Sequence, residues 1–271
     1  MSVPIELSLG EEALSRNVAD VPAAEHDESE AHHRRTLSDH PCPGVRLRHI
    51  VVVNMNNRRV LVDRHEEIAS ALDRLGVRRG RPVLVLVGGA AGMSRGHLEF
   101  VAELLRDAVL PVLIARDVAV VDGGTTSGVM GAVGRLHDRA LPLVGVVAEG
   151  VVGAADLEPH HVHLLVPGDS WGDESPWLAD VADVIAGGCR SVTLLINGGE
   201  ITYDDAAHSI ERGRPVLVLA ASGRTAAAIG AAAAGDVVGQ RAAEIAGSPL
   251  TRVVTAQDLA AAIEAELTTF G

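Results

Sequence analysis

The chain has 271 residues, of which 47% are hydrophobic and 22% are charged, and a formal net charge of −13. This is the composition of a globular protein with enough chain for one large α/β domain. All 23 basic residues are arginines, because the sequence contains no lysine. Pyridoxal phosphate enzymes, Schiff-base aldolases and P-loop NTPases each need a lysine, so these classes are excluded.

Charge, aromatic content and cysteine usage exclude further classes. The acidic balance and the presence of two Trp, one Tyr and two Phe argue against nucleic-acid binding. Two cysteines are too few for a disulfide framework or a four-ligand zinc site. Residues 1–10 do not read as a secretory leader, and no apolar run has the length of a membrane helix. We therefore expect no membrane span and a location in the reducing cytoplasm.

Residues 1–44 differ in composition from the rest of the chain. They hold nine acidic residues and three arginines, with no sustained apolar period. Such a segment cannot bury enough apolar surface to offset the entropy of ordering it. We predict a disordered acidic tail over residues 1–44 and one domain over residues 45–271.

The domain is expected to begin with a short β-hairpin. Residues 46–53 and 58–62 are strand-like, and asparagines between them tolerate the positive φ of a tight turn. Asp63 is then expected to cap a helix that runs to about Leu75, ahead of Gly76.

Six short apolar runs follow, and most of them precede a Gly, Ser, Thr or Asp cluster and a segment of helix length. Runs that are continuously apolar, rather than alternating, indicate strands buried on both faces. The pattern predicts an α/β fold, a doubly wound, Rossmann-like and mostly parallel sheet with helices on both faces. The expected strands are residues 83–87, 118–121, 143–147, 162–166, 192–196 and 216–219, and the expected last helix is 257–267.

Glycine-rich turns follow four of these strands, at residues 88–92, 123–128, 197–200 and 222–224. Ligands of open parallel sheets bind beyond the carboxyl ends of the strands, and helix N-termini there favour anions. Several such turns on one rim predict a phosphate or nucleotide site. The first turn lacks the spacing of G-x-G-x-x-G, which disfavours ordinary NAD dehydrogenase chemistry.

The same segments, in the same order, resemble motifs of one family. Residues 121–130 resemble its TGG-x-x-TGVM segment, and residues 161–166 (His-Val-His-Leu-Leu-Val) resemble its H-x-H-F-x-L-V segment. Residues 197–202 are similar to EGGPNT, and the stretch that ends Ser-Gly-Arg at residue 224 is similar to VVVEGSGR. The family is the SLOG superfamily, in particular the cytosolic N-terminal domain of TRPM channels, and a chain of this kind resembles its prokaryotic LSDAT branch.

The resemblance implies a domain that binds or senses a nucleotide or NAD-derived ligand, such as ADP-ribose, and requires no other cofactor. Related folds often pair, so a homo-oligomer is expected by analogy. The ligand-binding residues that it implies are Gly88, Gly89, Ala90, Gly123, Gly124, Thr125, Gly128, His161, His163, Asp169, Asn197, Gly198, Gly199, Glu200, Thr202, Ser222, Gly223 and Arg224.

The alternative function is a phosphoribohydrolase like the related Lonely Guy enzymes, which use a PGGxGTxxE motif. The double glycine and Thr202 are kept here, whereas Asn197 replaces the proline, Ile201 the later glycine and Asp205 the glutamate. Glu200 and Asp205 are the catalytic candidates that this alternative leaves.

Two further patterns each have two interpretations. His161 and His163 share one face of a strand, where a ring either bonds a ligand or satisfies a buried partner. No third ligand accompanies them, so we expect no metal site. Residues 168–172 match G-x-S-x-G, the nucleophile elbow of α/β-hydrolases, but a helix that begins near Ser175 starts too late for an elbow. Asp169 is instead expected on the ligand rim.

Overall fold

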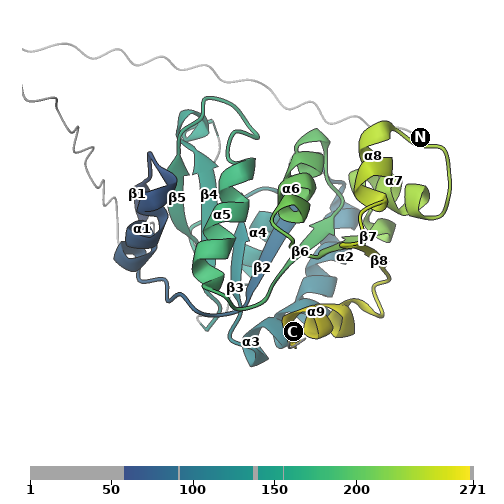
Figure 1. The fold of residues 1–271 in the computed structure, drawn as a ribbon, viewed down its shortest axis with the longest axis horizontal. Helices are drawn as coiled ribbons and strands as arrows, with labels where there is room; N and C mark the ends of the chain where they lie inside the picture. The colour runs from purple at the N-terminus through teal and green to yellow at the C-terminus, as the bar shows by residue number, and fades with distance from the viewer. Residues whose placement is uncertain (1–57, 91, 137–139, 155, 269–271) are drawn as a thin grey trace, which may run out of the picture. The chain divides into compact units, whose positions relative to one another are not determined.

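The computed structural model of the chain describes residues 58–90, 92–136, 140–154 and 156–268. The predicted tail and the first arm of the predicted hairpin lie outside these residues. The described part forms one parallel sheet of eight strands in the order β1-β5-β4-β3-β2-β6-β7-β8 (Figure 1). The predicted doubly wound parallel fold is therefore confirmed.

The strands are β1 (Arg59–Leu61), β2 (Val83–Gly88), β3 (Ala119–Asp122), β4 (Leu143–Ala148), β5 (Val162–Val166), β6 (Ser191–Ile196), β7 (Val216–Leu219) and β8 (Thr251–Val254). The helices are α1 (Ile68–Leu75), α2 (Arg95–Leu104), α3 (Leu110–Ala115), α4 (Gly128–Arg135), α5 (Ser175–Ala186), α6 (Glu200–Glu211), α7 (Arg224–Ala233), α8 (Gln240–Ala246) and α9 (Leu259–Thr268). Short turns of helix, η1 (His65–Glu67), η2 (Leu105–Val109), η3 (Glu149–Val151) and η4 (Ala220–Ser222), complete the described elements.

The predicted hairpin stays a prediction, because its first arm lies outside the described residues, whereas the predicted Asp63 cap is wrong. The second arm of the predicted hairpin is β1, which pairs in parallel with β5. The Asp63 side chain does not cap the following helix; instead Glu67 accepts the backbone N–H of Asp63 at 3.1 Å. The helix ends as predicted, because Gly76 adopts φ 73° directly after Leu75.

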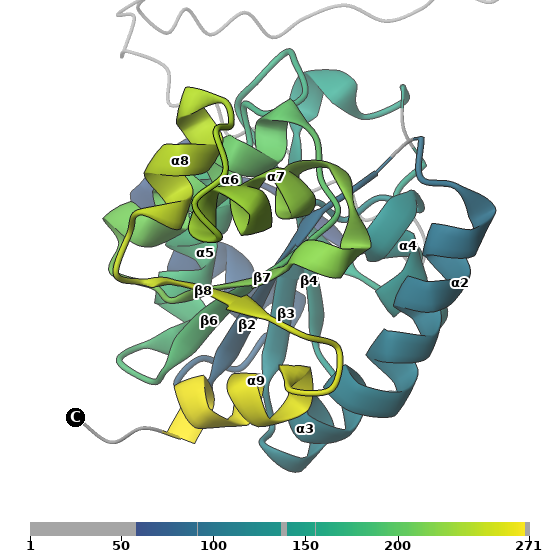
Figure 2. The same ribbon diagram turned by 90° about the vertical axis from the view of Figure 1, so that its right-hand side faces the viewer.

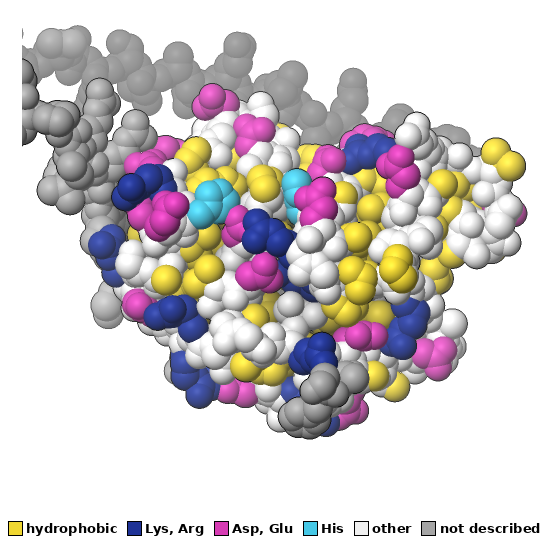
Figure 3. Space-filling model, viewed as in Figure 1, with side chains coloured by type: hydrophobic (Ala, Val, Ile, Leu, Met, Phe, Trp, Pro, Cys, Tyr) yellow, Lys and Arg dark blue, Asp and Glu magenta, His cyan; other side chains and the backbone are white. Residues whose placement is uncertain are grey.

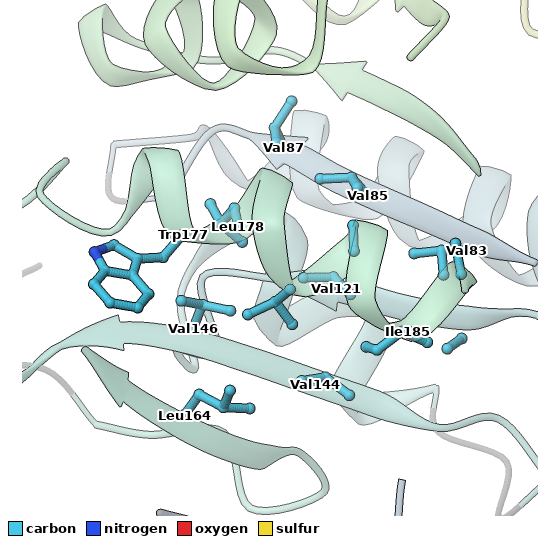
Figure 4. Packing of buried hydrophobic residues seen from close by; sticks show 14 of the residues in the cluster. Val83, Val85, Val87, Val121, Val144, Val146, Leu164, Trp177, Leu178 and Ile185 are labelled. Carbon is cyan, nitrogen blue, oxygen red and sulfur yellow. The ribbon is translucent and has the colours of Figure 1, made fainter. Parts of the chain in front are cut away.

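Helices cover both faces of the sheet, and each face has its own apolar core (Figure 2). Along β2, Val83, Val85 and Val87 face the core beneath α1, α5, α6, α7 and α8, whereas Leu84 and Leu86 face the core beneath α2, α3, α4 and α9. Figure 4 shows the first of these cores, with α5 packed over the strands. Burial on both faces explains why these strands are apolar at consecutive positions.

The direction of the strand order reverses between β2 and β6. From β2 the sheet extends through β3, β4 and β5 on one side, and from β6 through β7 and β8 on the other. Such a reversal is where the turns that leave two neighbouring strands diverge to opposite faces and open a crevice at the carboxyl rim. The turns that follow β2, β6 and β7 are thereby placed next to one another.

Candidate functional site

The turn after β2 packs closely against the backbone of β6 and α4, and glycines make this close approach possible. Gly88 has φ 156°, and a Cβ there would lie 1.9 Å from the Ile196 carbonyl oxygen. Gly128, with φ 53°, passes so close to Gly89 that a Cβ would lie 1.8 Å from the Gly89 carbonyl oxygen. The Gly89 N–H donates to Ile196 O at 3.0 Å, and the Gly89 carbonyl accepts from Val129 N at 3.0 Å. The Gly89 amide is thus held by main chain and is not free for a ligand.

The turns after β6 and β7 are joined through Asn197, which is buried and has φ 63°. Its backbone N–H donates to Ser222 Oγ at 2.6 Å, and its Nδ2 donates to the Ser222 carbonyl at 2.6 Å. Thr225 Oγ1 donates to the Gly199 carbonyl at 2.9 Å, which ties α7 to the start of α6. Asn197 Oδ1 is buried without a partner among the described residues. These bonds bring the predicted Asn197 and Ser222 segments together as one unit.

The N-termini of α6 and α7 lie side by side, with Arg224 between them. Gly199 and Gly223 are the N-cap residues. Part of each helix start is satisfied within the protein, because the Gly199 N–H donates to Thr202 Oγ1 at 3.1 Å and the Ala226 N–H donates to the Asn197 carbonyl at 2.8 Å. The first N–H groups of each helix, at residues 200 and 201 and at residues 224 and 225, are the main-chain donors left at this place. The Arg224 guanidinium approaches Gly199, where a Cβ would lie 3.4 Å from Nη2. Within the described part of the chain, no acidic side chain pairs with Arg224. Two helix N-termini and one unpaired guanidinium together favour an anion.

Arg224 also adopts a strained backbone conformation. Its φ of 51° lies in the left-handed region, which a residue with a Cβ adopts at a cost of about 1 kcal/mol. The side chain remains exposed to solvent. The guanidinium of this exposed side chain lies next to Gly199, at the start of α6.

The turn after β3 is fixed from below by a buried network of charged groups. Asp122 Oδ1 accepts the Gly124 N–H at 2.7 Å, and Asp122 Oδ2 accepts from His161 Nε2 at 3.0 Å. His161 Nδ1 donates to Glu158 Oε2 at 2.7 Å, and His160 Nδ1 lies 2.9 Å from Glu158 Oε1. The turn that carries Gly123, Gly124 and Thr125 is therefore held through Asp122, which the network connects to His161, Glu158 and His160.

The two predicted histidines differ in protonation: His161 is protonated near neutral pH and His163 is neutral. Burial by itself lowers the pKa of His161, but the charge and hydrogen bonds of Asp122 and Glu158 outweigh it and raise the pKa to about 9. Burial also opposes the shift at Glu158, yet bonds from His161 and His160 lower its pKa to about 2. Burial lowers the pKa of His163 to about 4, and its neutral ring donates from Nε2 to the Gly124 carbonyl at 3.0 Å. Both ring nitrogens of His161 are hydrogen-bonded, whereas Nδ1 of His163 is buried without a partner among the described residues. The interpretation of a satisfied buried ring therefore fits His161.

The catalytic candidates Glu200 and Asp205 lie in different surroundings. Glu200 is exposed and pairs with Arg241 at 3.3 Å. Asp205 is buried and accepts from Ser175 Oγ at 2.5 Å. Burial, with the nearby Glu174 carboxylate, raises the pKa of Asp205 to about 7. Asp205 therefore holds a proton near neutrality, as a general acid requires.

The loop after β5 borders the start of α6. Asp169 is exposed, and its N–H is held by Asp173 Oδ2 at 2.9 Å. A Cβ on Gly172 would lie 3.3 Å from Ile201, so the loop passes close to the start of α6 at this glycine. The neighbouring side chain of Trp171 is exposed, with 49% of its surface accessible. The helix begins at Ser175, and the nucleophile elbow suggested by G-x-S-x-G is not formed.

Two residues that contact the predicted turns or histidines are not among the residues predicted from the sequence. Glu158 is buried and contacts two histidines, His160 and His161, and the only signal for it is an acid two residues before this pair. His97 lies near Gly223, where a Cβ would be 3.8 Å from its ring. Its position on α2, far from the other turns in sequence, gives no signal of this contact.

Acidic and basic side chains are interspersed over the face shown in Figure 3 and form no continuous basic stripe there. No group of three or more His, Cys, Asp or Glu side chains is placed to hold a metal ion within the described ranges. None of the described helices combines the length and apolar composition needed to cross a bilayer.

Comparisons with known proteins identify a family. A family model described as "SLOG in TRPM, prokaryote" matches residues 81–265. A comparison with curated proteins finds no match. Among solved structures, the molybdenum cofactor carrier protein of Chlamydomonas reinhardtii is 17% identical, with a TM-score of 0.49, over 70% of this chain and 99% of its own. The molybdenum cofactor binding protein of Rippkaea orientalis is 14% identical, with a TM-score of 0.40, over 51% of this chain and 76% of its own. At this level of similarity neither protein indicates a ligand for this chain.

Proposed function

The chain belongs to the prokaryotic family of SLOG domains related to TRPM channels, and we propose that it binds a nucleotide or NAD-derived ligand, such as ADP-ribose, as a sensor. The ligand would lie at the carboxyl rim, over the β2–β6 reversal. In this proposal its phosphate groups face Gly198, Gly199 and Gly223, and its ribose lies toward Glu200. No further cofactor is needed for binding.

The observation that carries the proposal is the unpaired Arg224 guanidinium between two helix N-termini. Both the fractional positive charge of each helix end and the guanidinium attract an anion at the same place. The turns that hold them are joined by hydrogen bonds from Asn197 and Thr225, so little ordering is needed on binding. A diphosphate offers the two negative centres that such a site accommodates.

Calorimetry with ADP-ribose, NAD and AMP tests the proposal. The variant Arg224→Gln is expected to weaken the tightest of these ligands by about tenfold or more, because a hydrogen bond to a charged group contributes about 1.5–3 kcal/mol. The matched control is Arg252→Gln, which removes an exposed arginine that lies in β8 and is 3.8 Å from Glu266. Ligand at about 100 times its Kd is expected to stabilise the fold by about 2.7 kcal/mol.

Two results would contradict the proposal. One is that none of the three compounds binds or shifts the melting temperature. The other is that Arg224→Gln and Arg252→Gln bind with equal affinity, which would remove the guanidinium from the site.

Nucleotide cleavage is a second candidate because Asp205 on α6 is buried, bonded to Ser175 Oγ, and has a pKa raised by burial to about 7. Chromatography of the same mixtures would show free base if the chain hydrolyses its ligand, and Asp205→Asn would abolish that release. Intact ligand recovered after long incubation would leave binding alone. We also propose a homo-oligomer by analogy with related folds, which light scattering on the purified chain would decide.

A further inference from the structure

A cavity of about 310 Å³ lies at the amino ends of β4 and β5, on the side of the sheet opposite the carboxyl rim. Its polar lining comes from three arginines that precede β1 or follow α1, together with His160. α1 and β1 lie at one end of the molecule in Figure 1. The three arginines are Arg58, Arg78 and Arg81.

The arginines of this cavity exceed their acidic partners. Asp117 pairs with both Arg78 and Arg81, and the distance to Arg81 Nη2 is 2.9 Å. No acidic side chain of the described residues pairs with Arg58. Three guanidinium charges against one carboxylate leave a surplus of two positive charges, in a chain whose net charge is −13.

Arg81 places part of this surplus positive charge in the interior of the protein, away from solvent. The residue is only 7% exposed, and its Nε has no hydrogen-bond partner among the described residues. Burial of a guanidinium is costly unless it is compensated, and Arg81 shares its one carboxylate with Arg78. The carboxyl end of α1 also faces the cavity at Gly76, but a helix end carries only about half a negative charge.

The remaining wall of the cavity is apolar. Leu75, Val77, Leu141, Leu143 and Val162 line the space beside the guanidinium groups. A volume of about 310 Å³ is at the lower end for small-molecule pockets, which combine apolar walls with a few polar anchors. The chemistry that fits is an acidic group joined to a compact apolar body.

We propose that this cavity binds a small organic anion, a carboxylate or phosphate monoester that carries a compact apolar group, independently of the ligand at the carboxyl rim. Arg58 and Arg78 contact the acidic group from the solvent side, and Arg81 supplies charge from beneath. The apolar body packs against the leucine and valine side chains.

Calorimetry on the full chain at low ionic strength, with benzoate and phenyl phosphate as probes, tests the proposal and distinguishes the two acidic groups. Saturable binding of at least one probe is expected, with one site per chain. Benzyl alcohol, which lacks the charge, and inorganic phosphate, which lacks the apolar group, are both expected to bind at least about tenfold more weakly. Equal binding of inorganic phosphate and phenyl phosphate, or no saturable binding of either acidic probe, would overturn the proposal.

Three single variants locate the probe. Arg58→Gln and Arg78→Gln are each expected to weaken binding about fivefold to tenfold, since exposed charges contribute less than buried ones. Arg79→Gln, in the same loop but paired with Asp73 and outside the lining, is expected to bind as the unchanged chain does. Equal losses in Arg78→Gln and Arg79→Gln would overturn the assignment.

Arg224→Gln separates this site from the carboxyl rim. It is expected to leave the affinity for the probe unchanged while weakening ADP-ribose. Loss of probe binding in Arg224→Gln alone would place the anion at the rim and overturn the proposal, whatever the outcome for the nucleotide.

Discussion

The charged network beneath the β3 turn makes the stability of the fold depend on pH at the alkaline end. Burial alone would lower the pKa of His161, but Asp122 and Glu158 raise it from 6.5 to about 9. The folded state thus holds this proton more tightly than the unfolded chain does. Its contribution is fully present below about pH 6.5 and is lost as the pH rises through about 9.

The expected size of this effect follows from the two pKa values. The separation between 6.5 and about 9 corresponds to about 3 kcal/mol, of which about 2 kcal/mol is lost between about pH 7 and about pH 9.5. Few other groups titrate in that interval, because the chain has no lysine and one tyrosine. His163, with a pKa lowered by burial to about 4, and Asp205, raised by burial to about 7, act mainly below it.

Urea unfolding followed by circular dichroism across this pH interval measures the effect. His161→Gln is expected to lose about 3 kcal/mol at neutral pH, because it leaves two buried carboxylates without their cation, and to lose most of the alkaline slope. His208→Gln, at a half-buried histidine 3.1 Å from the exposed Glu211, is expected to keep both the stability and the slope. A free energy of unfolding that stays flat in the unchanged chain, or a slope that survives in His161→Gln, would refute the reasoning.

Two further substitutions test the buried acid and the glycine contact. Asp205→Asn keeps an acceptor for Ser175 but removes a carboxyl whose charged form is disfavoured by burial. Above about pH 7 this variant is expected to raise the free energy of unfolding by about 1–3 kcal/mol. Asp204→Asn, the exposed control, is expected to give no gain. Gly128→Ala drives a Cβ into the Gly89 carbonyl and is expected to cost at least about 2 kcal/mol in urea unfolding. Gly96→Ala, where a Cβ meets nothing within 4 Å, is expected to change stability by at most about 1 kcal/mol, and equal losses at the two glycines would contradict the contact.

The central strands could be predicted because their continuous apolar sequence indicates burial on both faces. A run such as residues 83–87 is apolar at consecutive positions. A strand needs this pattern only when both of its faces are buried. β8 could not be predicted in this way. It lies at the edge of the sheet, where Arg252 and Val253 are exposed, so it lacks the continuous apolar pattern.

The site was predictable in its parts and not in its connections. Glycines and an arginine after successive strands indicate an anion site, because parallel strands end at one rim. The sequence does not show that the Gly89 amide is taken by Ile196, nor that His161 bonds Asp122 across the sheet. Such contacts join residues far apart in the chain, and their partners are fixed only by strand order and register.

The β2–β6 ladder has a consequence for how the protein is made. It joins Val83 to Ser191 and Gly88 to Ile196, so the first strand of the core finds this neighbour only after β3, β4 and β5 have been synthesised. Contacts between residues so far apart in the sequence form slowly, because the entropy of a long loop is lost before the contacts stabilise the chain. The rim that joins the two halves is thus among the last regions to assemble. A molecule held there acts on the finished fold, and slows its opening rather than hastening its formation.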